Sequence, residues 1–344
     1  MNLKKLILLI TSLLIVITGV LGFNLYNKIY KPITIKNGFV YISTKSTFKD
    51  IENSVRPYLK RVKPFTWVAK RKKYTTNIKP GKYAIKENMN ANDLVNLLRS
   101  GNQTPVNLSF NNQDSFEKLA GRIAVQIEAD SASLLKAFKN EDLLNQYQFN
   151  SETALAMFIP NTYQFFWNTN AEDFIKRMQK EYNNFWNAQR IEKAKEINLT
   201  RVEVITLASI VQKETSLVSE RPMVAKLYLN RLKDNWPLQA DPTVIYAFKK
   251  KFGNHKTIKR VLKKDLEIES PYNTYKYAGL PPGPIGMPDI SSIDAVLNPA
   301  NHQYYYMCAS TKKIGSHEFA KTLQQHNKNA RVYQNWLNKQ GLFR

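Results

Sequence analysis

The hydrophobic residues of the chain follow three patterns, and each predicts a different kind of structure. Residues 6–27 form one apolar run without a charged side chain, long enough for the roughly 20 residues of a membrane-spanning helix. Residues 33–105 mix short β-branched and aromatic runs with helical spacing, and residues 106–344 show mainly helical spacing. We therefore expect an α+β protein with an anchor (1–32), a small α/β module (33–105) and a mixed α+β domain (106–344).

The apolar run is flanked by Lys4 and Lys5 on one side and by Lys28 and Lys31 on the other. It is longer than the roughly 7–15 apolar residues of a signal peptide, and Val20-Leu21-Gly22 within it would be only a poor cleavage site. We therefore expect the helix to stay attached as a single-pass anchor. The similar charge on its two sides does not decide its orientation by the positive-inside rule.

In the small module, β-branched and aromatic residues predict strands at 33–35, 39–42 and 82–86. Polar residues before apolar runs predict helices that begin near Thr47 and at Asn90. Four consecutive basic residues at 70–73 are expected in an exposed loop between these elements.

The larger domain is expected to contain several amphipathic helices. Their ranges are 115–129, 132–144, 171–186, 219–233 (capped by Ser219), 291–297 and 329–339, with a strand at 304–307 and a Pro/Gly-rich rigid loop at 270–288. Residues 158–167 carry five aromatic side chains. These aromatic residues could form a core or a platform on which sugar rings stack, and composition does not decide between the two.

One helical stripe ends in a carboxylate. Leu207, Ile210, Val211 and Glu214 share one helix face because their spacing is i, i+3, i+4 and i+7. Burial against the apolar stripe would raise the pKa of Glu214 toward the range of a general acid. The alternative is that Glu214 lies at the helix end and reaches water.

The amino-acid composition limits which partners and which kinds of site the protein can have. A net charge of +24 indicates an anionic partner (nucleic acid, an acidic membrane surface or an anionic polymer) or simply solvated, lysine-rich faces. The single cysteine, Cys308, excludes an internal disulfide and a cysteine metal cluster. The histidines His255, His302, His317 and His326 lack the spacing of a zincin-type pair, so we expect neither a metal nor a cofactor.

Serine-nucleophile and phosphate-loop motifs are also absent from the sequence. The remaining candidates are the carboxylates Glu214, Glu220 and Asp241. Ordinary glycosidases need two carboxylates, whereas a sugar that carries its own nucleophile needs only one, as an acid.

Short motifs around these carboxylates occur in a characteristic order. They occupy residues 158–163, 208–215, 219–222, 230–231, 238–246, 272–275, 279–285, 317–319 and 326–327. Together they resemble the YceG/MltG-like endolytic murein transglycosylases, a resemblance that covers roughly residues 155–330. Two positions depart from the family pattern: Gln212 stands where most members have Glu, and Asn161 where many have Asp.

The resemblance implies a reaction. Glu214 would act alone, first as acid and then as base, while the C6 hydroxyl of muramic acid attacks its own anomeric carbon. Cleavage of the MurNAc-GlcNAc β-1,4 bond would then leave 1,6-anhydroMurNAc ends without consuming water. The expected substrate-binding residues are Thr215, Glu220, Arg231, Gln239, Asp241, Thr243, Asn273 and Tyr275.

The resemblance also implies a location. It predicts a single helix in the inner (plasma) membrane, a LysM-like module at 33–105 and an extracytoplasmic catalytic domain that terminates nascent glycan strand elongation. The implied partners are peptidoglycan glycan strands, the membrane and peptidoglycan synthases, with no nucleic acid.

Two alternatives stay open. An inactive wall-binding or scaffolding protein could keep the same fold, and a glycan-cleavage assay would reveal it. A membrane-tethered nucleic-acid binder would show steep salt dependence of DNA binding.

Overall fold

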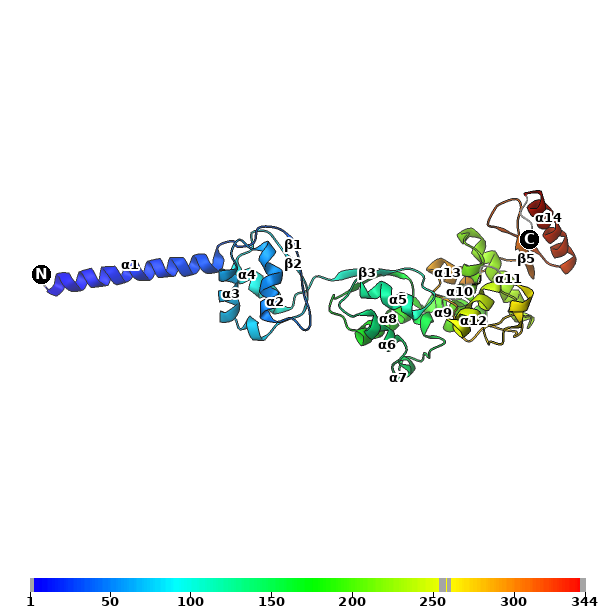
Figure 1. The fold of residues 1–344 in the computed structure, drawn as a ribbon, viewed down its shortest axis with the longest axis horizontal. Helices are drawn as coiled ribbons and strands as arrows, with labels where there is room; N and C mark the ends of the chain where they lie inside the picture. The colour runs from blue at the N-terminus through cyan, green and yellow to red at the C-terminus, as the bar shows by residue number, and fades with distance from the viewer. Residues whose placement is uncertain (1–2, 254–257, 259–260, 341–344) are drawn as a thin grey trace. The chain divides into compact units, whose positions relative to one another are not determined.

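The computed structural model describes residues 3–253, 258 and 261–340, so His255 lies outside the described residues. The chain packs into two compact units (Figure 1). The first unit contains residues up to Leu108 together with Ala124–Ala129 and Tyr163–Asn170, and the second contains the remainder. Helices and strands occur together in the described part, which confirms the α+β class.

Helix α1 (Leu3–Tyr30) confirms the single apolar N-terminal helix. Its mean hydropathy reaches 2.7, and none of its side chains is buried. By length and composition it is the one helix among the described residues that could cross a membrane.

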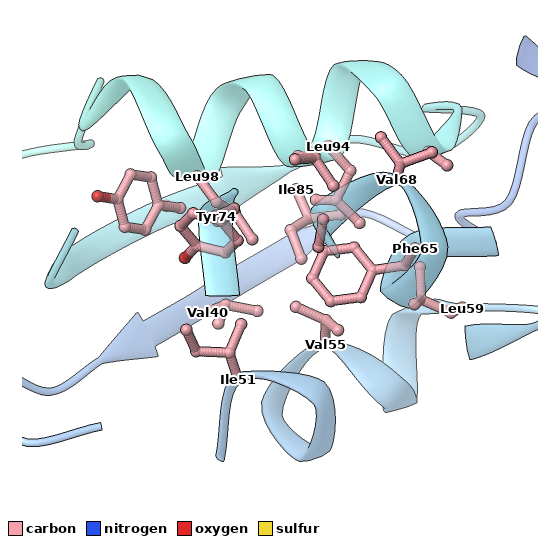
Figure 2. Close-up of a cluster of buried hydrophobic side chains, with 14 of the residues drawn as sticks. Val40, Ile51, Val55, Leu59, Phe65, Val68, Tyr74, Ile85, Leu94 and Leu98 are labelled. Carbon is pink, nitrogen blue, oxygen red and sulfur yellow. The ribbon is translucent and has the colours of Figure 1, made fainter. Parts of the chain in front are cut away.

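The small module packs helices α2 (Phe48–Val55), α3 (Val62–Arg71) and α4 (Ala91–Ser100) around a two-stranded antiparallel sheet. The strands are β1 (Gly38–Ile42) and β2 (Gly81–Ile85). Val40 pairs with Tyr83, and both side chains point into the core. Figure 2 shows Ile85 from β2 among Leu94 and Leu98 of α4, with Val55 of α2 on the opposite side.

The caps of this module form as the sequence predicts. The Thr47 side chain accepts from Asp50 N–H and the Asp50 side chain accepts from Thr47 N–H, a reciprocal capping box at the start of α2. The side chain of Asn90 accepts from the backbone of Asp93 at the start of α4, and Gly101 ends that helix with φ 73°.

Two predictions for the module are wrong. Residues 33–35 form no regular strand, because only the isolated bridges Pro32↔Asn90 and Thr34↔Leu59 occur there. The basic residues at 70–73 do not sit in a separate loop, since the first two form the last turn of α3. That helix was missed in the sequence although Phe65, Val68 and Ala69 form a buried face.

The remaining chain is mostly helical. Its helices are α5 (Phe116–Ala124), α6 (Ser131–Phe138), α7 (Glu141–Asn145), α8 (Ala171–Phe185), α9 (Ala188–Glu196), α10 (Arg201–Glu214), α11 (Arg221–Lys233), α12 (Asp241–Phe252), α13 (Ile290–Leu297) and α14 (Leu323–Lys339). Its strands are β3 (Val106–Phe110) with β4 (Asn161–Phe165), and β5 (Tyr306–Ala309) with β6 (His317–Ala320).

Several helices and strands begin or end at other residues than the sequence predicts. The helix expected over 115–129 ends at Ala124, and the one expected over 132–144 is split because Asn140 leaves the helical conformation to cap α7. The strand expected at 304–307 begins at Tyr306. The last helix begins at Leu323, where Thr322 provides the N-cap.

Ser219 does not cap a helix as expected. It lies inside a short 3-10 turn, Val218–Glu220, and α11 follows directly with a proline in its first turn. The 3-10 turn aims the Glu220 side chain at β6 instead of leaving it on the helix surface.

The aromatic residues near position 158 belong mainly to a core. The Phe158 ring lies 5.1 Å from Phe138 and 6.3 Å from Phe174 between ring centroids, and its side chain is buried. Phe165 is also buried, whereas Phe166 is exposed. The structure therefore favours packing over sugar stacking for Phe158 and Phe165.

Helix α10 occupies the centre of the second unit. Every residue from Val204 to Val211 is buried, and the helix contacts α9, α11, α12 and α13. The apolar surroundings fix the direction of α10 and thereby the position of its last residue, Glu214.

Candidate active site

Glu214 is the last residue of α10, where the buried helix reaches the surface. Leu207, Ile210 and Val211 are fully buried, as their spacing predicts, and Glu214 is only partly exposed. A reciprocal capping box of Thr200 with Glu203 begins the helix. Both ends of α10 are therefore defined, and the backbone position of Glu214 is fixed.

The main hydrogen-bond partner of Glu214 is Tyr228 on α11. The Tyr228 hydroxyl donates to Oε1 of Glu214 over 2.9 Å, and its side chain is 1% exposed. Burial and the neighbouring Glu214 raise the pKa of Tyr228 well above its usual range. Tyr228 therefore keeps its proton and acts as a permanent donor.

The electrostatics of the site favour a protonated Glu214. Burial raises the pKa of Glu214 to about 7, and the negative charge of Asp241 acts in the same direction. The Tyr228 hydrogen bond, His317 and Arg231 lower the pKa in part. A carboxyl group with such a pKa can give up and take back a proton near neutral pH.

Asp241 begins α12 and faces Tyr275. The Tyr275 hydroxyl donates to Oδ1 of Asp241 over 2.6 Å, and the Asp241 side chain is exposed. Burial, and then the bond to Asp241, raise the pKa of Tyr275. Because Asp241 is exposed and Glu214 is only partly exposed, the two carboxyl groups lie in different environments.

Glu220 holds His317 by two contacts. Its Oε1 accepts from the His317 backbone N–H over 2.7 Å, and its Oε2 lies 2.8 Å from His317 Nδ1. Among the described residues, Glu220 therefore pairs with His317 and not with Arg231. His317 was missed as a site residue, although it lies in one of the sequence motifs that indicated the site.

Arg231 is buried and bonds to main-chain oxygens. Its Nε donates to Tyr305 O over 2.8 Å and its Nη1 to Leu238 O over 2.6 Å, while the guanidinium lies 5.6 Å from the Trp236 ring. Arg231 therefore joins the segment before β5 to the loop before α12, and its charge acts on Glu214.

Four other predicted residues form hydrogen bonds to main-chain groups, three of them through their side chains and Gln239 through its backbone. Asn273 is fully buried, donates to Leu266 O and Ile268 O, and accepts from Tyr275 N–H. Its side chain therefore faces main-chain groups and fixes the backbone that carries Tyr275.

Thr243, Thr215 and Gln239 complete that group. The Thr243 hydroxyl donates to Ala240 O over 2.7 Å, and the Thr215 hydroxyl accepts from Leu217 N–H over 3.1 Å. Gln239 has an exposed side chain and a φ of 50°, and its N–H donates to Thr274 O.

The Pro/Gly-rich loop is attached firmly to α10. Ser209 Oγ accepts from Ile285 N–H over 3.0 Å, and Gln212 Oε1 accepts from Asp289 N–H over 2.5 Å at the start of α13. A Cβ atom on Gly283 would lie 2.0 Å from Glu152 O, so only glycine fits there. Gln212 thus bonds to α13, away from Tyr228 and Glu214.

No group of three or more His, Cys, Asp and Glu side chains is arranged to hold a metal ion within the part of the chain that the structure describes.

Comparison with known proteins identifies similar chains. The YceG-like family matches residues 40–332. The endolytic murein transglycosylase of Bacillus subtilis (strain 168) is 32% identical over 291 residues, which are 80% of this chain and 78% of that protein. The endolytic murein transglycosylase of Streptococcus pneumoniae serotype 2 is 26% identical over 79% of this chain, and the match spans about half (53%) of that longer protein.

A solved structure is also similar. The crystal structure of a YceG-like protein from Listeria monocytogenes superposes with a TM-score of 0.55 at 30% identity, covering 86% of this chain and 99% of that one.

Proposed function

The chain belongs to the YceG-like family, and on that premise we propose that it is a peptidoglycan lytic transglycosylase in which Glu214 is the only proton-transferring group. The observation that carries the proposal is the environment of Glu214. A partly buried carboxyl with a pKa raised to about 7 accepts a hydrogen bond from Tyr228. This environment suits one group that works as acid and then as base.

In the first step, the protonated Glu214 gives its proton to the glycosidic oxygen between MurNAc and GlcNAc. The bond between that oxygen and C1 of MurNAc breaks, and GlcNAc leaves with a new hydroxyl group. Tyr228 occupies Oε1 as a donor, so the acidic proton is placed on Oε2.

In the second step, the C6 hydroxyl oxygen of the same MurNAc forms a bond to C1. The carboxylate of Glu214 takes the hydroxyl proton, which restores the starting state. No water enters, and the product carries a 1,6-anhydroMurNAc end. A second catalytic carboxylate is unnecessary because the nucleophile belongs to the sugar.

Asp241, Tyr275 and His317 are proposed to contact the glycan beside Glu214. Asp241 and Tyr275 are joined by a 2.6 Å hydrogen bond, and Glu220 orients the His317 ring. The remaining predicted binding residues, such as Arg231 and Asn273, act in our proposal by holding the segments that carry these groups.

We further propose that α1 anchors the chain in the plasma membrane with residues 33–344 outside the cytoplasm, where peptidoglycan lies. In this arrangement residues 33–105 form a LysM-like module and 106–344 the catalytic domain. Cleavage of strands close to the membrane would end their elongation by synthases. Protease digestion of spheroplasts tests the orientation, since protection of the C-terminal domain would contradict it.

The activity itself is tested by mass spectrometry of purified glycan strands treated with the full-length chain. The expected products are internal fragments with 1,6-anhydroMurNAc ends, each lighter by one water than a hydrolysis product. Intact strands would support the inactive scaffold, and salt-sensitive DNA binding without cleavage would support the nucleic-acid binder.

A further inference from the structure

We propose that the junction of α1 with the small module is a binding site for the headgroup phosphate of an anionic phospholipid. The site is a pocket of about 420 Å³, within the usual range for small ligands. Its lining combines apolar and basic groups, among them Leu25, Tyr30, Trp67, Arg71, Lys72 and Asn92. The inference rests on the proposed membrane anchoring by α1.

The pocket lies at a defined depth relative to the bilayer. Residues 6–27 span about 33 Å as a helix, close to the roughly 30 Å of hydrocarbon in a membrane. Leu25 is then at the edge of the hydrocarbon, and Tyr30, more than one turn further, is at headgroup level. Tyr30 and Trp67 are the residue types that favour this interface.

The junction is rigid. Helix α1 contacts both α3 and α4 (Figure 1). The side chain of Ile29 packs against the core of the module. Ile33, three residues after the end of the helix, is buried and donates its N–H to Met89 O over 2.9 Å. The module therefore begins where the helix leaves the bilayer, and the pocket stays at the membrane surface.

The basic groups that line the pocket, Arg71 and Lys72, and the neighbouring Lys28 have no acidic partner among the described residues. Lys28 Nζ lies 4.6 Å and the Arg71 guanidinium 5.3 Å from the centroid of the same Trp67 ring. None of the ion pairs between described residues involves Lys28, Arg71 or Lys72. Cations that share one ring repel each other, and an anion beside them would relieve that repulsion.

The ammonium group of Lys72 uses two of its three N–H donors within the protein. Its ammonium group donates to Oδ1 of Asn92 and to Oδ1 of Asn96, each over 2.5 Å. An ammonium group has three N–H donors, so one remains for a ligand. The neighbouring acid, Asp93, accepts from the side chains of Asn90 and Asn92 instead. A phosphate oxygen of the lipid could accept a hydrogen bond from the remaining N–H donor of Lys72, and an acyl chain of the lipid could pack against Leu25.

The test uses the full-length chain in nanodiscs of phosphatidylcholine with a minor fraction of phosphatidylglycerol. Native mass spectrometry of the released protein identifies the retained lipid. We expect one phosphatidylglycerol, enriched at least about fivefold over its share of the disc, because each cation near an anionic surface contributes about 1 kcal/mol. Equal retention of both lipids in proportion to the disc would overturn the proposal.

Arg71→Gln is the test variant and Lys63→Gln its matched control. Both residues are exposed on α3, about 12 Å apart along the helix, and each change removes one positive charge. Arg71→Gln should reduce the enrichment about fivefold while Lys63→Gln leaves it unchanged. An equal loss of enrichment in both variants would mean that positive charge anywhere on α3 attracts the lipid, and it would contradict a specific site at Arg71.

A further arm separates lipid from free phosphate. Inorganic phosphate added to discs should not displace the retained phosphatidylglycerol, since it cannot contact Leu25. Displacement, or retention of phosphate alone, would overturn the lipid assignment. Recovery of the protein with the discs checks the anchoring by α1 separately, and none of these measurements depends on glycan cleavage.

Discussion

The hydroxyl group of Tyr228 on α11 donates a hydrogen bond to Oε1 of Glu214 at the end of α10, over 2.9 Å. Because burial keeps Tyr228 protonated, it never accepts the Glu214 proton. The bond therefore stabilises the carboxylate form, and it favours the proton of the acid form on Oε2 because Oε1 accepts from Tyr228. This contact therefore acts on both the acidity and the geometry of Glu214, beside burial and the charges of Asp241, His317 and Arg231.

Tyr228→Phe should raise the pKa of Glu214 above 7, since the hydrogen bond lowers it in the wild type. A hydrogen bond to a charged group is worth roughly 1.5–3 kcal/mol, so a shift of about one unit is expected. In kcat/KM against pH, activity that needs the acid form falls as pH rises, and this limb should move to higher pH. Tyr182→Phe, a buried tyrosine on α8, is the control and should leave the limb unchanged.

Glu214→Gln should abolish glycan cleavage while keeping the fold. Glutamine preserves the size and can still accept from Tyr228, but it cannot supply a proton. General acid–base catalysis contributes roughly 10²–10⁴-fold, and we expect the upper end because one group serves both steps. Release of anhydro products over time measures the effect. Activity within tenfold of the wild type would remove Glu214 from its role.

The same substitution should change the pH dependence of stability. The folded-state pKa of Glu214 is raised from 4.5 to about 7, so its contribution to stability is fully present below about pH 4.5. It is lost as pH rises through 7, where ionisation inside the fold becomes necessary. Glu214→Gln should therefore become more stable than the wild type at pH 8 by about 2–3 kcal/mol, with a smaller difference at pH 5. Urea unfolding at both pH values measures it, and a difference independent of pH would contradict the raised pKa.

A chain truncated to residues 106–344 should be less stable than one of residues 33–344. The segments Ala124–Ala129 and Tyr163–Asn170 belong to the first compact unit and would lose their partners. Glu128 accepts from Ser43 Oγ over 2.5 Å, and Trp167 packs against Tyr41 with ring centroids 5.2 Å apart. Thermal unfolding should show a lower midpoint for the shorter chain. Identical midpoints would mean that these contacts contribute nothing.

Local signals in the sequence were sufficient for much of the fold. The cap at Asn90 and the stripe ending at Glu214 each depend on neighbours in the chain, and each forms as predicted. The helix α3 was missed because its short apolar face is followed by a basic run that is typical of loops.

Contacts between distant residues could not be predicted in the same way. Tyr228 has the spacing of a core residue on α11, and only the packing of α11 on α10 brings its hydroxyl to Glu214. His317 meets Glu220 across 97 positions of sequence, which no periodicity encodes. Asn273 is polar within a matched motif, yet its amide serves the backbone, because polarity does not tell a ligand contact from a buried main-chain bond.

Asp241→Asn separates a one-carboxylate from a two-carboxylate mechanism. Asparagine can still accept from Tyr275, so the pair that we propose contacts the glycan keeps its shape. The negative charge of Asp241 raises the pKa of Glu214, and its removal should lower that pKa and move the falling limb of kcat/KM to lower pH. At pH values below this falling limb, kcat/KM of Asp241→Asn should be lower than that of the wild type by about tenfold or less. This loss is far smaller than the one expected for Glu214→Gln. In a hydrolase with two catalytic carboxylates, both substitutions would be comparably severe, and the reducing ends would take up oxygen from isotopically labelled water. With the sugar's own C6 hydroxyl as nucleophile, Asp241→Asn should still release 1,6-anhydro ends that contain no solvent oxygen.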